Sequence, residues 1–144
     1  IAEWAESQNP QESFLVVMAD IDNFKAVNDH FGHLAGDRVI QNLALLLEEM
    51  APDQAVTARV GGEEFAVIAP VSAVGGDGRA LMEKLMNEVR KQIVDIKSTR
   101  LEYRISLAGG VFHYPVDFDA ALQEVDRLLY RAKGEGRDRL IWRE

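Results

Sequence analysis

The stretch Ala55-Val-Thr-Ala-Arg-Val-Gly-Gly-Glu-Glu-Phe-Ala-Val-Ile-Ala69 contains two short apolar runs separated by two glycines and two glutamates. The runs, 55–60 and 65–69, are β-like, so Gly61-Gly62 predicts the turn of a hairpin. Such a turn can lie against a bound anion or a flat base, and its carboxylates can hold the cation that accompanies an anion. A solvated turn with two surface glutamates is the alternative.

Apolar periodicity predicts the other elements. Residues 13–19 are a continuous apolar run ending at Asp20-Ile-Asp22, which is typical of a central strand buried on both faces. The predicted helices cover residues 24–31, 39–50, 81–96 and 118–132, and further strands cover 101–108, ending at Gly109-Gly110, and 139–142. This order predicts one α+β domain with helices packed on a single sheet. Because a strand after a helical crossover commonly returns parallel to its predecessor, we expect the hairpin beside strand 13–19 and parallel to it.

Composition narrows the functional classes. The 144 residues suffice for a single domain with one core, and 47% of them are hydrophobic and 28% charged, as in ordinary globular proteins. The sequence has no cysteine, which excludes disulfides, thiolate metal sites and thiol nucleophiles. No apolar run approaches the length of a membrane span, so we expect no membrane contact by this domain. A net charge of -8 argues against binding a nucleic-acid polymer, but not against binding one nucleotide.

Two acidic positions are predicted to meet at one end of the sheet. If the hairpin lies beside strand 13–19, Asp20 faces Glu63, and the backbone oxygen of Ile21 is close to both. Two carboxylates and one carbonyl are a typical set of ligands for a protein to contribute to a Mg2+ site. The alternative for Asp20 and Asp22 is a strand end that simply enters solvent.

The segment after this strand end opens a helix, whose free amides can point at phosphates, and Lys25 adds a positive charge there. Asn28 and Asp37 are polar residues in an apolar neighbourhood, and an Asp carboxylate can accept hydrogen bonds from N1-H and the exocyclic amine of guanine. The alternative is structural: Asp37 caps the helix at Val39 and Asn28 serves a turn.

Lys133 and Arg137 flank glycines after the last predicted helix and can reach a triphosphate. They can equally be surface cations that the helix dipole favours. His30 and His33 do not predict a metal pair without a third ligand nearby; a hydrogen bond from His33, locally or to a ligand, is the better interpretation.

Three segments together resemble the GGDEF family of diguanylate cyclases. They are Asp20-Ile-Asp-Asn-Phe-Lys-Ala-Val-Asn-Asp-His-Phe-Gly-His-Leu-Ala-Gly-Asp37, Arg59-Val-Gly-Gly-Glu-Glu-Phe65 and Leu129-Tyr-Arg-Ala-Lys-Gly-Glu-Gly-Arg137. The resemblance implies a palm-like domain of the ferredoxin-like, nucleotidyl cyclase type, with a mixed or antiparallel sheet of about five strands flanked by helices. It also implies that two GTP are joined into cyclic di-GMP with release of two pyrophosphates, one GTP being held by each domain of a homodimer.

The resemblance further implies a role for individual residues. Asp20, the Ile21 carbonyl and Glu63 would hold Mg2+ or Mn2+, and either Glu63 or Glu64 would accept the proton of the attacking hydroxyl, with Lys25 assisting catalysis. The residues implied in binding GTP are Asn23, Phe24, Lys25, Asn28, His33, Asp37, Gly61, Gly62, Lys133 and Arg137.

The chain departs from the family pattern at one regulatory site. Family members restrained by their product carry an Arg-x-x-Asp site before the hairpin glycines, and here Pro52 and Ala55 occupy the two positions. We therefore expect no product inhibition through that site. A catalytically silent module that binds GTP or cyclic di-GMP remains the alternative function.

We also predict a domain division and a location. Residues 1–12 are expected to be the remnant of a linker or helix, and residues 13–144 to form the cyclase domain. Such a domain would be the cytoplasmic output part of a longer signalling protein.

Overall fold

The structure is a computed structural model that describes residues 12–144, so nearly all of the linker or helix expected over 1–12 lies outside the described residues. The elements in chain order are β1 (Phe14–Ile21), α2 (Phe24–Phe31), α3 (His33–Met50), β2 (Val56–Arg59), β3 (Glu64–Pro70), α4 (Val71–Val74), α5 (Gly78–Arg90), β4 (Val94–Ile96), β5 (Thr99–Leu101), β6 (Ile105–Phe112), α6 (Phe118–Gly134) and β7 (Leu140–Arg143). None of the helices in this part of the chain is long and apolar enough to span a membrane.

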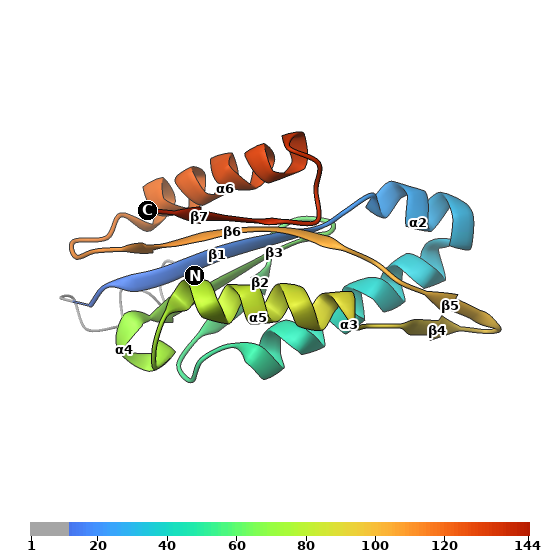
Figure 1. The fold of residues 1–144 in the computed structure, drawn as a ribbon, viewed down its shortest axis with the longest axis horizontal. Coiled ribbons are helices and arrows are strands. Elements are labelled where there is room, and N and C mark those ends of the chain that lie inside the picture. The colour runs from blue at the N-terminus through green and yellow to red at the C-terminus, as the bar shows by residue number, and fades with distance from the viewer. Residues whose placement is uncertain (1–11) are drawn as a thin grey trace.

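A mixed sheet forms the centre of the molecule. Its five strands follow the order β2-β3-β1-β6-β7, and only the pair β6–β7 is parallel. α6 covers one face of this sheet, and α3 and α5 cover the other, while α2 extends beyond the end of β1 (Figure 1). The predicted α+β fold with a five-stranded sheet flanked by helices is therefore confirmed.

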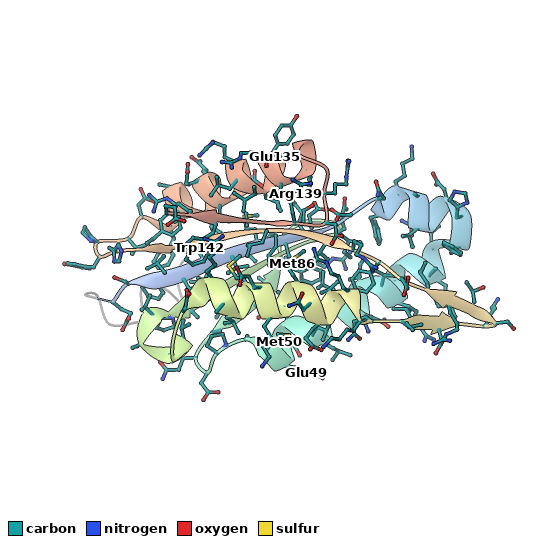
Figure 2. The ribbon with its side chains drawn as sticks, viewed as in Figure 1. Glu49, Met50, Met86, Glu135, Arg139 and Trp142 are labelled. Carbon is teal, nitrogen blue, oxygen red and sulfur yellow. The ribbon has the colours of Figure 1, made fainter. Side chains whose placement is uncertain are left out.

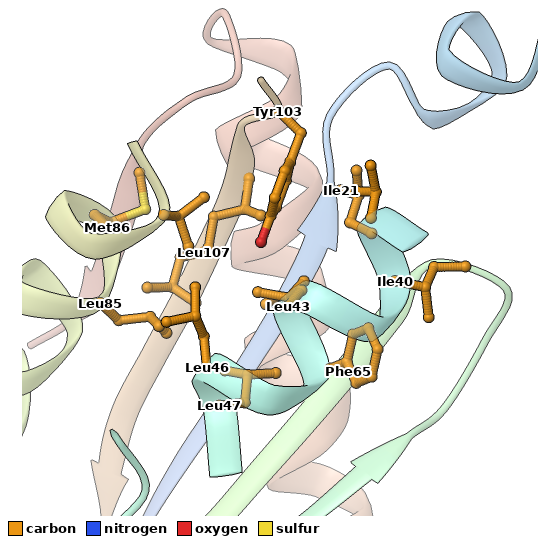
Figure 3. Packing of buried hydrophobic residues seen from close by; sticks show 14 of the residues in the cluster. Ile21, Ile40, Leu43, Leu46, Leu47, Phe65, Leu85, Met86, Tyr103 and Leu107 are labelled. Atoms are coloured by element: carbon orange, nitrogen blue, oxygen red, sulfur yellow. The ribbon is translucent and has the colours of Figure 1, made fainter. Parts of the chain in front are cut away.

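β1 is central, as its apolar run predicts, because all eight of its residues are buried. Alternate side chains of β1 enter two separate apolar clusters. Leu43, Leu46 and Leu47 of α3 pack with Leu107 in the larger cluster, between α3, α5 and the sheet (Figure 3). In Figure 2, Met50 and Met86 lie on the α5 side of the sheet, whereas Glu135 lies on the α6 side. Helices on both faces thus fix the position and direction of β1.

The hairpin lies beside β1, as expected, but the expected parallel orientation is wrong. β3 pairs with β1 in antiparallel register, so Asp20 lies opposite Glu64 and not opposite Glu63 as expected. The crossover through α2 and α3 returns to β2, which runs parallel to β1 at the outer edge of the sheet. The hairpin then reverses the chain and inserts β3 between them.

The turn of the hairpin is wider than a two-residue Gly-Gly turn. Four residues separate β2 from β3, and neither glycine has a positive φ. The Arg59 guanidinium instead donates to the Gly61 carbonyl at 3.2 Å and to the Gly62 carbonyl at 2.6 and 3.0 Å. An Arg at the end of β2 therefore closes the turn and holds the glutamates that follow it.

Two boundaries between 81 and 112 differ from the prediction. The helix ends at Arg90, and Val94–Ile96 forms an antiparallel hairpin with β5, because Val94 and Ile96 also fit the alternation of a strand. The next strand begins at Ile105 and continues through the two glycines to Phe112. It is buried on both faces rather than half-buried, since α6 covers the face that carries Ser106 and Ala108.

Candidate active site

An open pocket of about 470 Å3 lies where β1 ends and the chain enters α2. It is lined from β1, the start of α2, the hairpin turn and the end of α6. The lining residues are Asp20, Ile21, Asp22, Asn23, Phe24, Lys25, Ala26, Asp29, Glu63, Lys133 and Arg137. Four separate segments of sequence thus supply carboxylates, cations and backbone amides to one cavity.

Asp20 and Lys133 form an ion pair at the base of this pocket. The Lys133 ammonium donates to Asp20 Oδ2 at 2.6 Å, and the Asp20 side chain is only 6% exposed. Burial raises the pKa of Asp20, against the opposing effect of the Lys133 charge and hydrogen bond; the Glu63 charge raises it further. The Asp20 carboxylate is therefore desolvated, and the neighbouring Lys133 ammonium only partly offsets the cost of burying its charge.

The two glutamates of the hairpin both lie near Asp20, on the β3 side of β1. The Ile21 amide donates to the Glu63 carbonyl at 3.2 Å, which ties the turn to the end of β1. Glu64 lies opposite Asp20 in the sheet, so the two carboxyl groups are close neighbours. Burial, and then the Asp20 charge, raise the pKa of Glu64. Glu63 lines the pocket, whereas Glu64 contacts the pocket through Asp20.

The donor set fits a hard divalent cation. Asp20 and Glu63 bring carboxylate oxygens to the same pocket. Ile21 also lines this pocket, and its backbone is hydrogen-bonded to that of Glu63. Mg2+ prefers oxygen ligands and usually takes only one or two carboxylates from the protein. No cluster of three or more His, Cys, Asp and Glu side chains able to hold a metal occurs within residues 12–144. A cation here would therefore depend on waters or on a phosphate ligand to complete its coordination.

The first turn of α2 presents unpaired amides to the pocket. Asn23 adopts a left-handed conformation with φ 54°, and its side chain makes no capping hydrogen bond. The amides at the start of the helix have no partner inside the helix, and their dipoles favour an anion. Phe24 and Lys25 line the pocket at this turn, so an anionic group can meet both amides and an ammonium.

Arg137 reaches the pocket from the turn after α6. Arg137 and Asp138 both have positive φ, 62° and 48°, and the Arg137 amide donates to the Ala132 carbonyl at 3.0 Å. Lys133 and Arg137 therefore enter the same cavity as two cations, as predicted from their positions around the glycines.

The residues predicted to bind guanine lie outside this pocket, at the junction of α2 and α3. Asn28 is half-buried inside α2, and its side chain packs against Gly36 of α3. His33 and Asp37 are exposed in the first turns of α3. The alternative in which Asp37 caps a helix at Val39 is wrong, because α3 begins six residues earlier than Val39, at His33.

The hairpin glycines also lie outside the pocket lining. A Cβ at Gly61 would come within 3.1 Å of Glu64 Oε2, whereas a Cβ at Gly62 would meet nothing within 4 Å. Gly61 therefore leaves room for the Glu64 carboxylate, and Gly62 leaves the outer surface of the turn open.

Asp22 is a site residue that our prediction did not assign. It is 7% exposed, accepts a hydrogen bond from the Ser106 hydroxyl at 2.6 Å, and accepts another from the Asp138 amide at 2.8 Å. Burial raises the pKa of Asp22, against the effect of these two hydrogen bonds. The Asp-x-Asp spacing at the end of β1 was visible in the sequence, but the partners on β6 and after α6 were not. Ala26 and Asp29 of α2 also line the pocket without having been predicted.

Comparison with known proteins places this chain in a family. Residues 2–139 match the family model described as "Diguanylate cyclase, GGDEF domain". The chain is 38% identical over 126 residues to the diguanylate cyclase DgcP of Pseudomonas aeruginosa, covering 88% of this chain and 19% of that protein. It is 37% identical over 129 residues to the probable diguanylate cyclase DgcF of Escherichia coli K12, covering 86% of this chain and 41% of that protein. The chain thus spans less than half the length of these curated relatives.

Solved structures show the same fold. The GGDEF domain of DgcB from Caulobacter crescentus, in complex with c-di-GMP, superimposes with a TM-score of 0.82 at 28% identity, over 96% of this chain and 80% of that one. The diguanylate cyclase SiaD of Pseudomonas aeruginosa, in complex with its activator SiaC, gives a TM-score of 0.86 at 29% identity, over 99% of this chain and 54% of that one.

Proposed function

Because this chain belongs to the GGDEF domain family of diguanylate cyclases, we propose that it condenses two GTP into cyclic di-GMP with release of two pyrophosphates. The observation that carries the proposal is the pocket that joins Asp20 and Glu63 to Lys133, Arg137 and the first turn of α2. Its carboxylates suit a divalent cation, and its cations and amides suit a triphosphate. A bound divalent cation and a held triphosphate are the two requirements for attack of a hydroxyl on an α-phosphate.

Asp20, Glu63 and the Ile21 carbonyl would hold the cation, with Mg2+ or Mn2+ as the expected metal. When bound, the cation would neutralise negative charge on the triphosphate as the pyrophosphate departs. Lys133 and Arg137 have a complementary task, since both can stay on the phosphate oxygens throughout. Lys133 is already oriented toward this position by its 2.6 Å contact with Asp20.

The first turn of α2 would bind the phosphates through the Asn23 and Phe24 amides and the Lys25 ammonium. The turn is rigid because the Val27 amide donates to the Asn23 carbonyl at 3.2 Å, and Val27 is buried. A preorganised set of donors stabilises the charge that develops on the phosphoryl oxygens without having to rearrange.

Guanine would lie toward the junction of α2 and α3, where Asn28, His33 and Asp37 are found. A carboxylate can accept from both N1-H and the exocyclic amine of guanine, which adenine does not offer in that pattern. The open surface beside Gly62 gives the nucleotide room near the hairpin.

Glu64 is the better of the two glutamates as the proton acceptor. The 3'-oxygen of one nucleotide forms a bond to the α-phosphorus of the other, the bond to pyrophosphate breaks, and the hydroxyl proton passes to a carboxylate. A carboxylate with a raised pKa holds a proton more firmly, and burial raises that of Glu64. Glu63 would instead be engaged with the cation.

Each domain contributes one such pocket, so the reaction needs two copies facing one another as a homodimer. Each hydroxyl then attacks the phosphate held by the other domain, and binding turns an encounter of two nucleotides into a positioned reaction. Product inhibition through an Arg-x-x-Asp site is not part of the proposal. Pro52 and Ala55 provide no charge at those positions, and Pro52 lines a small apolar cavity with Met50 and Val67.

The test is incubation of the dimerised domain with GTP and Mg2+, followed by mass spectrometry of the nucleotides and assay of pyrophosphate. One cyclic di-GMP and two pyrophosphates are expected for every two GTP consumed. Tight GTP binding without either product, in a domain that is dimeric under the assay conditions, would instead favour the silent binding module.

A further inference from the structure

The turn that carries Arg137 is held in an unfavourable backbone conformation. Arg137 and Asp138 are consecutive residues other than glycine with φ of 62° and 48°, and Gly136 before them has φ 121°. Residues with side chains avoid this region, and they remain in it only where their surroundings impose it. Some other part of the molecule must therefore fix the turn.

Asp138 receives the contacts that fix it. Its amide donates to Asp22 Oδ2 at 2.8 Å, and the Arg90 guanidinium donates to its carboxylate at 3.0 Å and to its carbonyl at 3.0 Å. The two contacts with Arg90 are exposed, whereas the contact with Asp22 is partly buried. The buried contact is less screened by solvent, so Asp22 is the stronger anchor.

Asp22 is itself immobilised. Its other oxygen, Oδ1, accepts from the fully buried Ser106 hydroxyl at 2.6 Å, and its own amide donates to the Arg104 carbonyl at 2.9 Å. Both carboxylate oxygens are thus used, one toward β6 and one toward the turn after α6. Although Asp22 lines the pocket, it completes no metal cluster with Asp20 and Glu63 within the part of the chain that the structure describes.

We propose that Asp22 is a positioning residue that holds the Arg137–Asp138 turn against β1 and β6 and so aims the Arg137 guanidinium at the phosphate end of the pocket. The inference rests on the proposed function, since it takes Arg137 to bind nucleotide phosphate. A buried carboxylate is costly unless its hydrogen bonds are complete, and here one of the two holds the turn whose Arg137 side chain lines the pocket.

Two substitutions separate positioning from charge. Asp22→Ala removes both hydrogen bonds. Asp22→Asn removes the charge but can keep both contacts, because its oxygen accepts from the Asp138 amide while its NH2 donates to a rotated Ser106 hydroxyl. The ligand is a GTP analogue with a methylene bridge between the α- and β-phosphates, which binds without turnover, and its affinity is measured by calorimetry.

We expect Asp22→Ala to weaken analogue binding by about tenfold, the loss typical of one charge-assisted phosphate contact, and Asp22→Asn to restore it to within about threefold. In an Arg137→Ala background, Asp22→Ala should change affinity by less than about twofold, because the contact it supports is already gone. Equal losses from Asp22→Ala with and without Arg137 would overturn the proposal, as would failure of Asp22→Asn to restore binding.

Hydrogen exchange of the Asp138 amide gives a readout that needs no nucleotide. Exchange should accelerate at least about tenfold in Asp22→Ala and stay near the wild-type rate in Asp22→Asn. An unchanged rate in Asp22→Ala would refute the anchoring of the turn.

If Asp22→Ala does not fold, Ser106→Ala is the substitute variant. It removes only the hydroxyl that donates to Asp22 Oδ1, and we expect it to weaken analogue binding by about two- to fivefold. Wild-type affinity in that variant would also contradict the proposal. Absence of analogue binding by the wild-type domain, with the Asp138 amide still protected, would refute the proposed function instead.

Discussion

Gly36 controls the position of Asn28, and replacing it by alanine tests the guanine site. A Cβ at Gly36 would lie 3.0 Å from Asn28 Cγ and 3.0 Å from Phe24 Cζ, and nearer still to the Asn28 side-chain oxygen. Ordinary contact at a Cβ begins at 3.4 Å. Because Gly36 is buried on α3 where α3 packs against α2, the added methyl must push the Asn28 amide aside by roughly 1 Å.

The expected energies follow from two opposing effects. Overpacking of this kind destabilises by about 1–3 kcal/mol, whereas alanine in a helix stabilises by about 0.5–1 kcal/mol relative to glycine. The free energy of unfolding should therefore fall by only about 0–2.5 kcal/mol, and the domain should remain folded. Displacement of a recognition group by roughly 1 Å costs far more in function, up to about a hundredfold.

The assay compares calorimetric affinities for non-hydrolysable GTP and ATP analogues. Gly36→Ala should weaken GTP binding by about tenfold to a hundredfold and ATP binding, which relies on the phosphates, by less than about threefold. Gly134→Ala is the matched control, because a Cβ there meets nothing within 4 Å at the end of α6. If folded Gly36→Ala keeps wild-type affinity and wild-type preference for GTP, Asn28 does not read guanine.

Three further predictions concern the same site and the core. Glu64→Gln should keep the fold and GTP binding but lose most turnover in a pyrophosphate-release assay; full activity would exclude Glu64 as the base. Burial raises the pKa of Asp20 above its unfolded value, so the native state binds more protons than the unfolded chain, and stability declines as pH rises from about 4 through the raised pKa. Asp20→Asn should therefore raise Tm at pH 7 by calorimetry, with a gain that shrinks toward pH 4, and a lower Tm at pH 7 would contradict this. Leu43→Ala removes a fully buried side chain of α3 and should lower the free energy of unfolding by about 2–5 kcal/mol in urea titrations, whereas Leu45→Ala, at a position 59% exposed on the same helix, should change it by less than about 0.5 kcal/mol.

The pocket shows where sequence patterns suffice. Asp20 follows a run of buried residues, and Glu63 follows the glycines of the hairpin turn. The meeting of these two residues at one end of the sheet was therefore predictable from the order of the elements. Lys133 and Arg137 were predictable for the same reason, since Lys133 lies in the last turn of an amphipathic helix and Arg137 follows that helix. Local spacing determines where such side chains stand on their own helix or strand.

The direction of β3 was not predictable in this way. β3 can lie antiparallel beside β1 because β2, which runs parallel to β1, lies at the outer edge of the sheet. This strand order depends in turn on which faces of the sheet α3, α5 and α6 cover. Residues 94–96 were assigned to a helix instead of a strand for a related reason. Apolar spacing there fits both a helix and a strand, and contact with the rest of the core selects between them.

The sequence by itself determined the strands of the main sheet and the longer helices, the acidic hairpin and the family, because these follow from periodicity and from motifs along the chain. It also identified Asp20, Glu63, Lys133 and Arg137, which meet in the pocket. Only the tertiary structure decided that β3 runs antiparallel to β1, and that Asp22 joins Ser106 on β6 to the amide of Asp138. Asp22 is 84 residues from Ser106 and 116 from Asp138 along the chain, and such pairings are set by how helices and strands pack in space rather than by any local pattern.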